Sequence, residues 1–146
     1  MDRNLGASQV ATSATDEASY GDLYQWGRGK DGHEKRTSGT RAELSSGDVP
    51  GHADFILCNK SDDPSVPSGY WRETPNNELW QGVDGVNNPC PSGFRLPTKD
   101  EFQAELDTWS SKDAAGAFAS PLKLPAAGFR FYFNGNIYPD VDLAYW

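Results

Sequence analysis

The strongest local signal in the chain is a helix start directly after Pro97. Thr98 stands at the N-cap position and Glu101 follows three residues later, which is the capping-box pattern. Asp100 and Glu101 also place negative charge in the first turn, where it complements the positive end of the helix dipole. The pattern predicts a well-defined helix in a chain whose other segments carry weaker signals.

The same helix is expected to be amphipathic. Phe102, Leu106 and Trp109 recur at spacings that place them on one face, so we expect all three to be buried. Residues 110–111, two serines, end or interrupt the helix, and a second short helix is expected over 113–119.

Other segments favour strands and loops. Asn134-Gly135 between residues 129–133 and 137–138 predicts a hairpin, and residues 54–58 read as a short buried strand. A further strand is expected from Leu143 onward, and residues 20–27 fit either a strand or a helical turn. The glycine-rich tract 27–53 is expected to be a functional or a disordered loop, and residues 59–69 form another loop.

Length and charge restrict the class of protein. The 146 residues fit a single domain, 1–146, with its own core. A net charge of −8 disfavours nucleic-acid binding, because the basic run in 28–41 is diluted by acidic residues. The chain contains no apolar run of membrane-spanning length, and residues 1–6 lack the apolar region of a signal peptide. For an exported protein, the signal is expected outside this chain.

Catalytic motifs are weak. Residues 27–32 match GxGxxG, but no apolar-periodic helix follows, so a flexible turn is favoured over a nucleotide site. His33-Glu34 begins an HExxH pattern that Thr37 breaks. A zinc site using both His33 and His52 is conceivable, but solvated loop histidines are the favoured interpretation. The chain also lacks GxSxG and CxxC motifs.

Two further features leave alternatives open. Asp84, Asn87 and Asn88 are oxygen-bearing loop residues that could hold Ca²⁺, although turn-capping roles are favoured and the spacing fits no EF-hand. Cys58 and Cys90 permit one disulfide, which we favour slightly over two free thiols.

The chain is rich in large aromatic side chains, with five tryptophans and six tyrosines. Trp26, Trp80 and Trp109 are expected mainly as buried pegs that fix loops. Tyr70 and Trp71 lie beside a loop rich in Pro and Gly, where exposed aromatics often bind ligands. The candidate ligand-binding set is Tyr70, Trp71, Arg72 and Trp80.

Residues 90–98, Cys-Pro-Ser-Gly-Phe-Arg-Leu-Pro-Thr, with Glu101-Phe102 and Leu106, resemble a family signature. The signature is CPxGWxLPTxxEWxxL, of the Fibrobacter succinogenes major paralogous domain, and its last leucine falls one position before Leu106. Residues 1–5 look like the WMxxNL start of that family and residues 20–27 like its YGxLYxW segment. Tyr145-Trp146 resembles the beginning of its YWSS strand, so the resemblance extends from end to end.

The resemblance implies a bacterial module of the cell envelope or of the secreted proteins. It implies a C-type-lectin-like α+β fold, with a twisted antiparallel sheet, one or two helices and long irregular loops. Residues 95–98 with Glu101 are also similar to formylglycine-generating-type domains, which share that fold. No reaction is established for the paralogous-domain family.

The chain departs from the family at several positions. Phe94 and Phe102 stand where the signature has tryptophan. Family members continue past YWSS through further strands, so we expect either a shortened sheet or a dimer that covers the open edge. The formylglycine-generating reaction uses cysteines in that later region, to which neither Cys58 nor Cys90 corresponds, so this activity is not expected.

These observations predict a non-catalytic surface or secreted module that binds a glycan or a protein. We expect no membrane insertion and no cofactor. Ca²⁺ is the metal that the loop residues could hold, although turn-capping roles are favoured for them. The alternative is a structural protein that forms a homodimer through its open sheet edge. A small enzyme using His33 or His52 with loop carboxylates is the third hypothesis.

Overall fold

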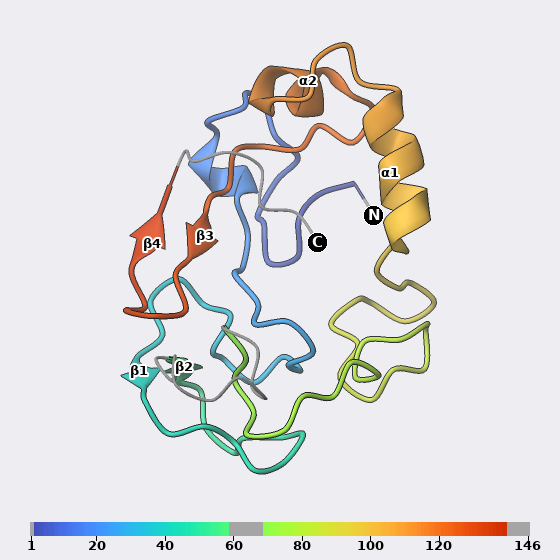
Figure 1. Ribbon diagram of the computed structural model, residues 1–146. Coiled ribbons are helices and arrows are strands. Elements are labelled where there is room, and N and C mark those ends of the chain that lie inside the picture. Colours follow the sequence, from blue (N-terminus) through green and yellow to red (C-terminus); the bar gives the residue numbers. More distant parts are fainter. Residues whose placement is uncertain (1, 59–68, 140–146) are drawn as a thin grey trace. The chain divides into compact units, whose positions relative to one another are not determined.

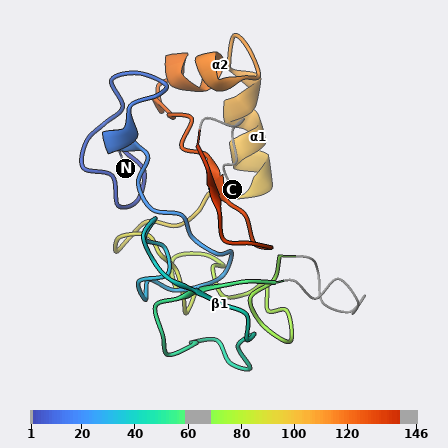
Figure 2. The same ribbon diagram turned by 90° about the vertical axis from the view of Figure 1, so that its left-hand side faces the viewer.

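The computed structural model of the chain describes residues 2–58 and 69–139. By contacts it divides into two compact units: one comprises 1–22, 97–129 and 138–146, and the other comprises 23–96 and 130–137. Figures 1 and 2 show long loops between a few short elements. The mixture of helices and short sheets is compatible with the predicted α+β class. In chain order the elements are η1 (Glu17–Ser19), β1 (Thr40–Arg41), β2 (Phe55–Ile56), α1 (Lys99–Asp107), α2 (Ala114–Ala119), β3 (Phe129–Arg130) and β4 (Ile137–Tyr138).

The first unit contains both α-helices, and their starts confirm the sequence prediction. Thr98 Oγ1 accepts a hydrogen bond from Glu101 N at 3.2 Å, and Glu101 Oε2 accepts one from Thr98 N at 2.8 Å. This reciprocal pair satisfies two amide groups that the first turn of α1 leaves unpaired. α1 ends at Asp107, and α2 begins after Asp113, whose carboxylate accepts from Gly116 N at 2.9 Å.

The apolar face of α1 is buried less than its spacing predicts. Trp109, just after the helix, is buried, whereas Phe102 and Leu106 are half-buried. The rings of Phe102 and Trp109 meet edge to face with centroids 6.5 Å apart. The prediction therefore holds in full only for Trp109.

The second unit is built around a small core rather than a large sheet. β1 and β2 pair in parallel, with Thr40 opposite Phe55 and Arg41 opposite Ile56, which differs from the antiparallel sheet expected from the sequence. The predicted strand over 54–58 is thus reduced to two residues, and the predicted loop 27–53 contributes its partner. Buried side chains from loops complete the core cluster of Leu44, Ile56, Cys58, Trp71 and Leu79, against which Tyr132 packs.

A glutamine side chain takes the place of a third strand beside β2. The amides of Phe55 and Leu57 donate to the β1 side, to Gly39 O and Arg41 O. Ile56 N therefore points the other way, and it donates to Gln25 Oε1 at 3.0 Å. Gln25 Nε2 donates back to Ile56 O at 2.8 Å, so the buried backbone of β2 is satisfied on both sides.

The predicted hairpin at Asn134-Gly135 is present. Phe131 N donates to Asn136 O and Gly135 N donates to Phe131 O, both at 2.8 Å. Gly135 adopts a positive φ of 73°, which glycine reaches without strain. β3 and β4 form a second two-stranded sheet.

Several predictions fall outside the described residues. These include the strand expected from Leu143, the sheet edge near Trp146, and with that edge the proposed dimer contact. Within the part of the chain that the structure describes, no helix has the length and hydropathy needed to cross a membrane.

Replacing Gln25 by Leu is expected to lower the free energy of unfolding by about 3 kcal/mol, because Ile56 would keep a buried N–H and C=O without partners. Urea denaturation followed by tryptophan fluorescence measures this change. Gln81→Leu is the matched control: Gln81 is exposed, so the expected change is within about 0.5 kcal/mol. Equal stability of the two variants would contradict the strand-like role of Gln25.

Candidate functional site

A group of charged and polar side chains is buried in the second unit, within the tract where sequence reasoning expected a flexible turn. Arg28 and His33 are 0% exposed and Glu34 is 1% exposed, with Gln25 also buried. The expectation that His33 is a solvated loop histidine is therefore wrong. Buried charges require partners, and each of these residues has them.

Arg28 makes the largest number of these contacts. Its Nε donates to Asp31 Oδ2 at 2.8 Å, and Nη1 donates to Gln25 Oε1 and to Asp54 O, both at 2.9 Å. Nη2 donates to His52 O at 2.8 Å. One guanidinium thus joins two separate stretches of loop, residues 25–31 and 52–54, and this explains why the GxGxxG-like turn is held in place.

His33 is neutral and its tautomer follows from its contacts. Nε2 accepts a hydrogen bond from Gln25 N at 3.0 Å, so Nδ1 carries the proton and lies 2.7 Å from Asp31 Oδ1. Burial, followed by the charge of Arg28, lowers the pKa of His33 from 6.5 to about 4. Burial acts to raise the pKa of Asp31, but hydrogen bonds from His33 and Arg28 lower it overall.

Asp31, His33 and Glu34 bring one nitrogen and two carboxylate oxygens within 4.8 Å of one another, a donor set that transition metals accept. Their atoms are already committed: Arg28 holds Asp31, and Gly32 N donates to Glu34 Oε2 at 2.8 Å. Across the described residues, no buried side-chain nitrogen or oxygen lacks a partner. A cation here would have to displace these bonds beside a guanidinium, so the cluster fits a structural role better than a metal centre.

Two predicted ligand-binding aromatics are core residues. Trp71 is 1% exposed and its Nε1 donates to Trp26 O at 2.7 Å. Trp80 is 6% exposed and its Nε1 donates to Arg28 O at 3.2 Å. Neither indole offers a free face for stacking. Trp26, expected as a buried peg, is instead 37% exposed at the edge of Trp80.

Tyr70 and Arg72, the other two members of the predicted set, are half-buried and engaged. The Tyr70 hydroxyl donates to Asn76 O at 2.9 Å and accepts from Asn76 N at 3.0 Å. Arg72 donates to Gly47 O at 3.2 Å and pairs with Asp48 at 3.1 Å. Both residues fix loop backbone in this structure.

The residues predicted as calcium ligands also serve as loop anchors. Asn87 is buried, and its Nδ2 donates to Gly27 O and Asp48 O, both at 2.9 Å. Asn88 Oδ1 accepts from Cys90 N at 3.1 Å, which is the turn role that sequence reasoning favoured. Asp84 is exposed.

The predicted disulfide between Cys58 and Cys90 is not formed, and both cysteines are free thiols. Cys58 is buried in the core cluster, so its side chain packs as a small apolar group. Cys90 is half-buried, and burial raises the pKa of its thiol.

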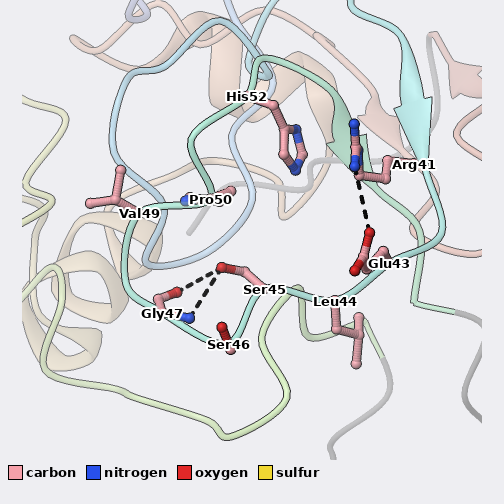
Figure 3. Close-up of a pocket in the computed structure, with 9 residues that line it drawn as sticks. All are labelled: Arg41, Glu43, Leu44, Ser45, Ser46, Gly47, Val49, Pro50 and His52. Atoms are coloured by element: carbon pink, nitrogen blue, oxygen red, sulfur yellow. Dashed lines mark hydrogen bonds and ion pairs between the residues drawn. The ribbon is translucent and has the colours of Figure 1, made fainter.

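A pocket of about 300 Å³ opens in the second unit. Figure 3 shows His52 and Arg41 on one side of it, with the Ser45–Gly47 turn across from them. The turn is held by Ser45 N donating to Trp71 O and Glu73 N donating to Ser45 O, both at 3.0 Å. All lining residues come from the long tract: Arg41, Glu43, Leu44, Ser45, Ser46, Gly47, Val49, Pro50 and His52.

The polar groups around this pocket are only loosely paired. Arg41 lies 3.5 Å from Glu43 and 3.6 Å from Asp54, both longer than a good hydrogen bond. His52 Nδ1 accepts from Asp54 N at 3.2 Å, which leaves the ring proton on Nε2. Among the described residues Nε2 has no partner. The sequence predicts a functional or a disordered loop for this tract, and it singles out His52 only as a conceivable zinc ligand or catalytic histidine.

Family models, curated protein sequences and solved structures were each compared with the chain, and none of them matches it.

The buried His33 predicts a specific pH dependence of stability. Because its pKa is lowered on folding, the unfolded chain takes up a proton that the folded chain does not. The contribution of neutral His33 to the free energy of unfolding is complete above pH 6.5. It is lost as the pH falls toward about 4, and the total loss is about 3 kcal/mol.

Urea denaturation at a series of pH values, compared with His33→Gln, isolates this contribution. The imidazole proton resonances of His33 should also stay unchanged between pH 7.5 and 5.5, a measurement that does not depend on a variant. A His33 resonance that titrates near pH 6.5 would contradict the buried, neutral assignment.

The two thiols are expected to react differently. Under native conditions a thiol reagent should label Cys90 slowly and leave Cys58 unlabelled, because Cys58 is buried. In denaturant both should react, and peptide mass spectrometry identifies the labelled position. A chain that shows no reactive thiol in denaturant without reductant would instead contain the disulfide.

Proposed function

We propose that this chain is a non-catalytic binding module that recognises a glycan in the pocket beside Arg41 and His52. The proposal is carried by the contrast between two polar clusters in the same unit. The buried cluster around Arg28 is saturated with internal hydrogen bonds. The pocket, in contrast, offers a guanidinium that makes only long ion pairs and an imidazole N–H that has no partner within the described residues.

The size and lining of the pocket favour a small, hydroxyl-rich ligand. Its volume of about 300 Å³ is at the lower end of small-molecule sites. Val49 and Pro50 add an apolar wall to a mainly polar lining, which suits a sugar ring with polar edges and an apolar face. A protein ligand would use a broader surface, so the glycan is the preferred alternative of the two.

The arrangement offers little for catalysis. A serine nucleophile needs a histidine nitrogen that accepts its proton. Ser45 Oγ is committed to Gly47 O at 2.9 Å, and His52 uses Nδ1 to accept from Asp54 N. In the described part of the chain, no hydrogen bond connects a pocket serine to His52. The other histidine, His33, is sealed from solvent.

We further propose that the chain belongs to the Fibrobacter succinogenes major paralogous domain family and has its C-type-lectin-like fold. The support is the motif in residues 90–98 followed by the capped helix α1. Such a module would act at the cell envelope or outside the cell, where glycans are abundant.

Arg41→Ala and His52→Ala are each expected to weaken glycan binding about tenfold, because each removes a hydrogen-bond donor from the pocket. A glycan array identifies a ligand, and titration calorimetry with the best hit measures its affinity. Arg95→Ala is the matched control, since Arg95 is an exposed arginine outside the pocket lining. Binding that survives both pocket substitutions, or an array without any hit, would contradict the proposal.

A further inference from the structure

The charged groups at the pocket are one positive side chain and two negative ones. Arg41 lies between Glu43, at 3.5 Å, and Asp54, at 3.6 Å. Its side chain is 45% exposed, and the side chains of Glu43 and Asp54 are 81% and 37% exposed. One positive charge is thus flanked by two negative charges, all open to solvent.

Resting on the function proposed above, we propose that the ligand is a neutral rather than an acidic sugar, with neighbouring hydroxyl groups bound by Arg41 and Glu43. A hydroxyl both donates and accepts, so one sugar hydroxyl can accept from the guanidinium while the next donates to the carboxylate. The separation of 3.5 Å exceeds the usual N–H···O distance, so the two groups do not satisfy each other fully.

Acidic sugars fit this geometry less well than neutral ones. A carboxylate or sulfate on the ligand would meet Arg41 only in the presence of Glu43 and Asp54, in a chain of net charge −8. A neutral ligand avoids this repulsion and still uses the charged groups as strong hydrogen-bonding partners.

Two other groups complete the proposed subsite. His52 Nε2–H is a donor in addition to the Arg41 guanidinium. The His52 ring is held in place by the Asp54 N–H, which donates to its other nitrogen. Val49 and Pro50 line the pocket beside it, where they can contact the apolar face of the ring. The exposed side chain of Ser46 lies at the turn across from His52.

The test compares two methyl glycosides of matched stereochemistry: a neutral hexose and the corresponding uronic acid. Amide resonances of Ser46 and Gly47 report pocket occupancy in NMR titrations of the full chain. The pair is repeated for the gluco, galacto and manno configurations. We expect at least one neutral sugar to bind about tenfold more tightly than the corresponding uronic acid.

Glu43→Gln tests the charge argument directly. It keeps an acceptor at the same position but removes a negative charge, so it should narrow the preference for the neutral sugar over the uronic acid. Glu78→Gln, at an exposed glutamate outside the lining, is the control and should leave the preference unchanged. Because Glu43 is exposed, the substitution is not expected to impair folding.

The outcomes separate this inference from the function on which it rests. A uronic acid that binds more tightly than the neutral sugar, as measured by the pocket resonances, would overturn the inference and leave the glycan-binding proposal standing. If no glycoside in the panel moves these resonances, while a larger array glycan binds elsewhere or not at all, both proposals fail. An unchanged preference in Glu43→Gln would also count against the inference.

Discussion

The guanidinium of Arg28 is the contact on which the second unit most depends. It is fully buried, and it binds one carboxylate, one side-chain amide and two backbone carbonyls. Taking a charged group out of water carries a large desolvation cost, which only a complete set of partners offsets. Removing one partner would leave a charge buried without compensation, so the network is a condition for this arrangement of loops.

This constraint explains how a unit with so little regular structure is held together. Two-residue strands contribute few ladder bonds, and a sheet of that size does not stabilise a fold alone. Side chains take over the task that strands perform elsewhere. Gln25 supplies the missing edge of β2, and Asn87 joins the backbone at Gly27 and Asp48. In the same way, the indole N–H groups of Trp71 and Trp80 donate hydrogen bonds to loop carbonyl oxygens.

The sequence predicted the parts of this molecule that are decided locally. The capping box at Thr98, the helix after Asp113 and the turn at Gly135 depend on residues within a few positions of one another. Burial of Arg28 depends instead on partners from a distant segment, the carbonyl oxygens of His52 and Asp54, which no periodicity reveals. Nor does the sequence show that Trp71 is buried and Trp26 exposed. Aromatic residues in loops follow no spacing pattern from which burial can be predicted.

The buried network and the open pocket are connected through one short segment. Arg28 holds the carbonyl oxygens of His52 and Asp54, while the His52 ring lines the pocket and the Asp54 carboxylate lies beside Arg41. Because the buried Arg28 fixes the backbone at His52 and Asp54, it also sets the positions of the His52 and Asp54 side chains. Binding groups held in advance lose less conformational entropy when a ligand arrives. Arg28 has a full set of hydrogen-bond partners and holds the backbone rigid. Arg41 makes only long ion pairs, so in the proposed function its N–H groups can bind a ligand.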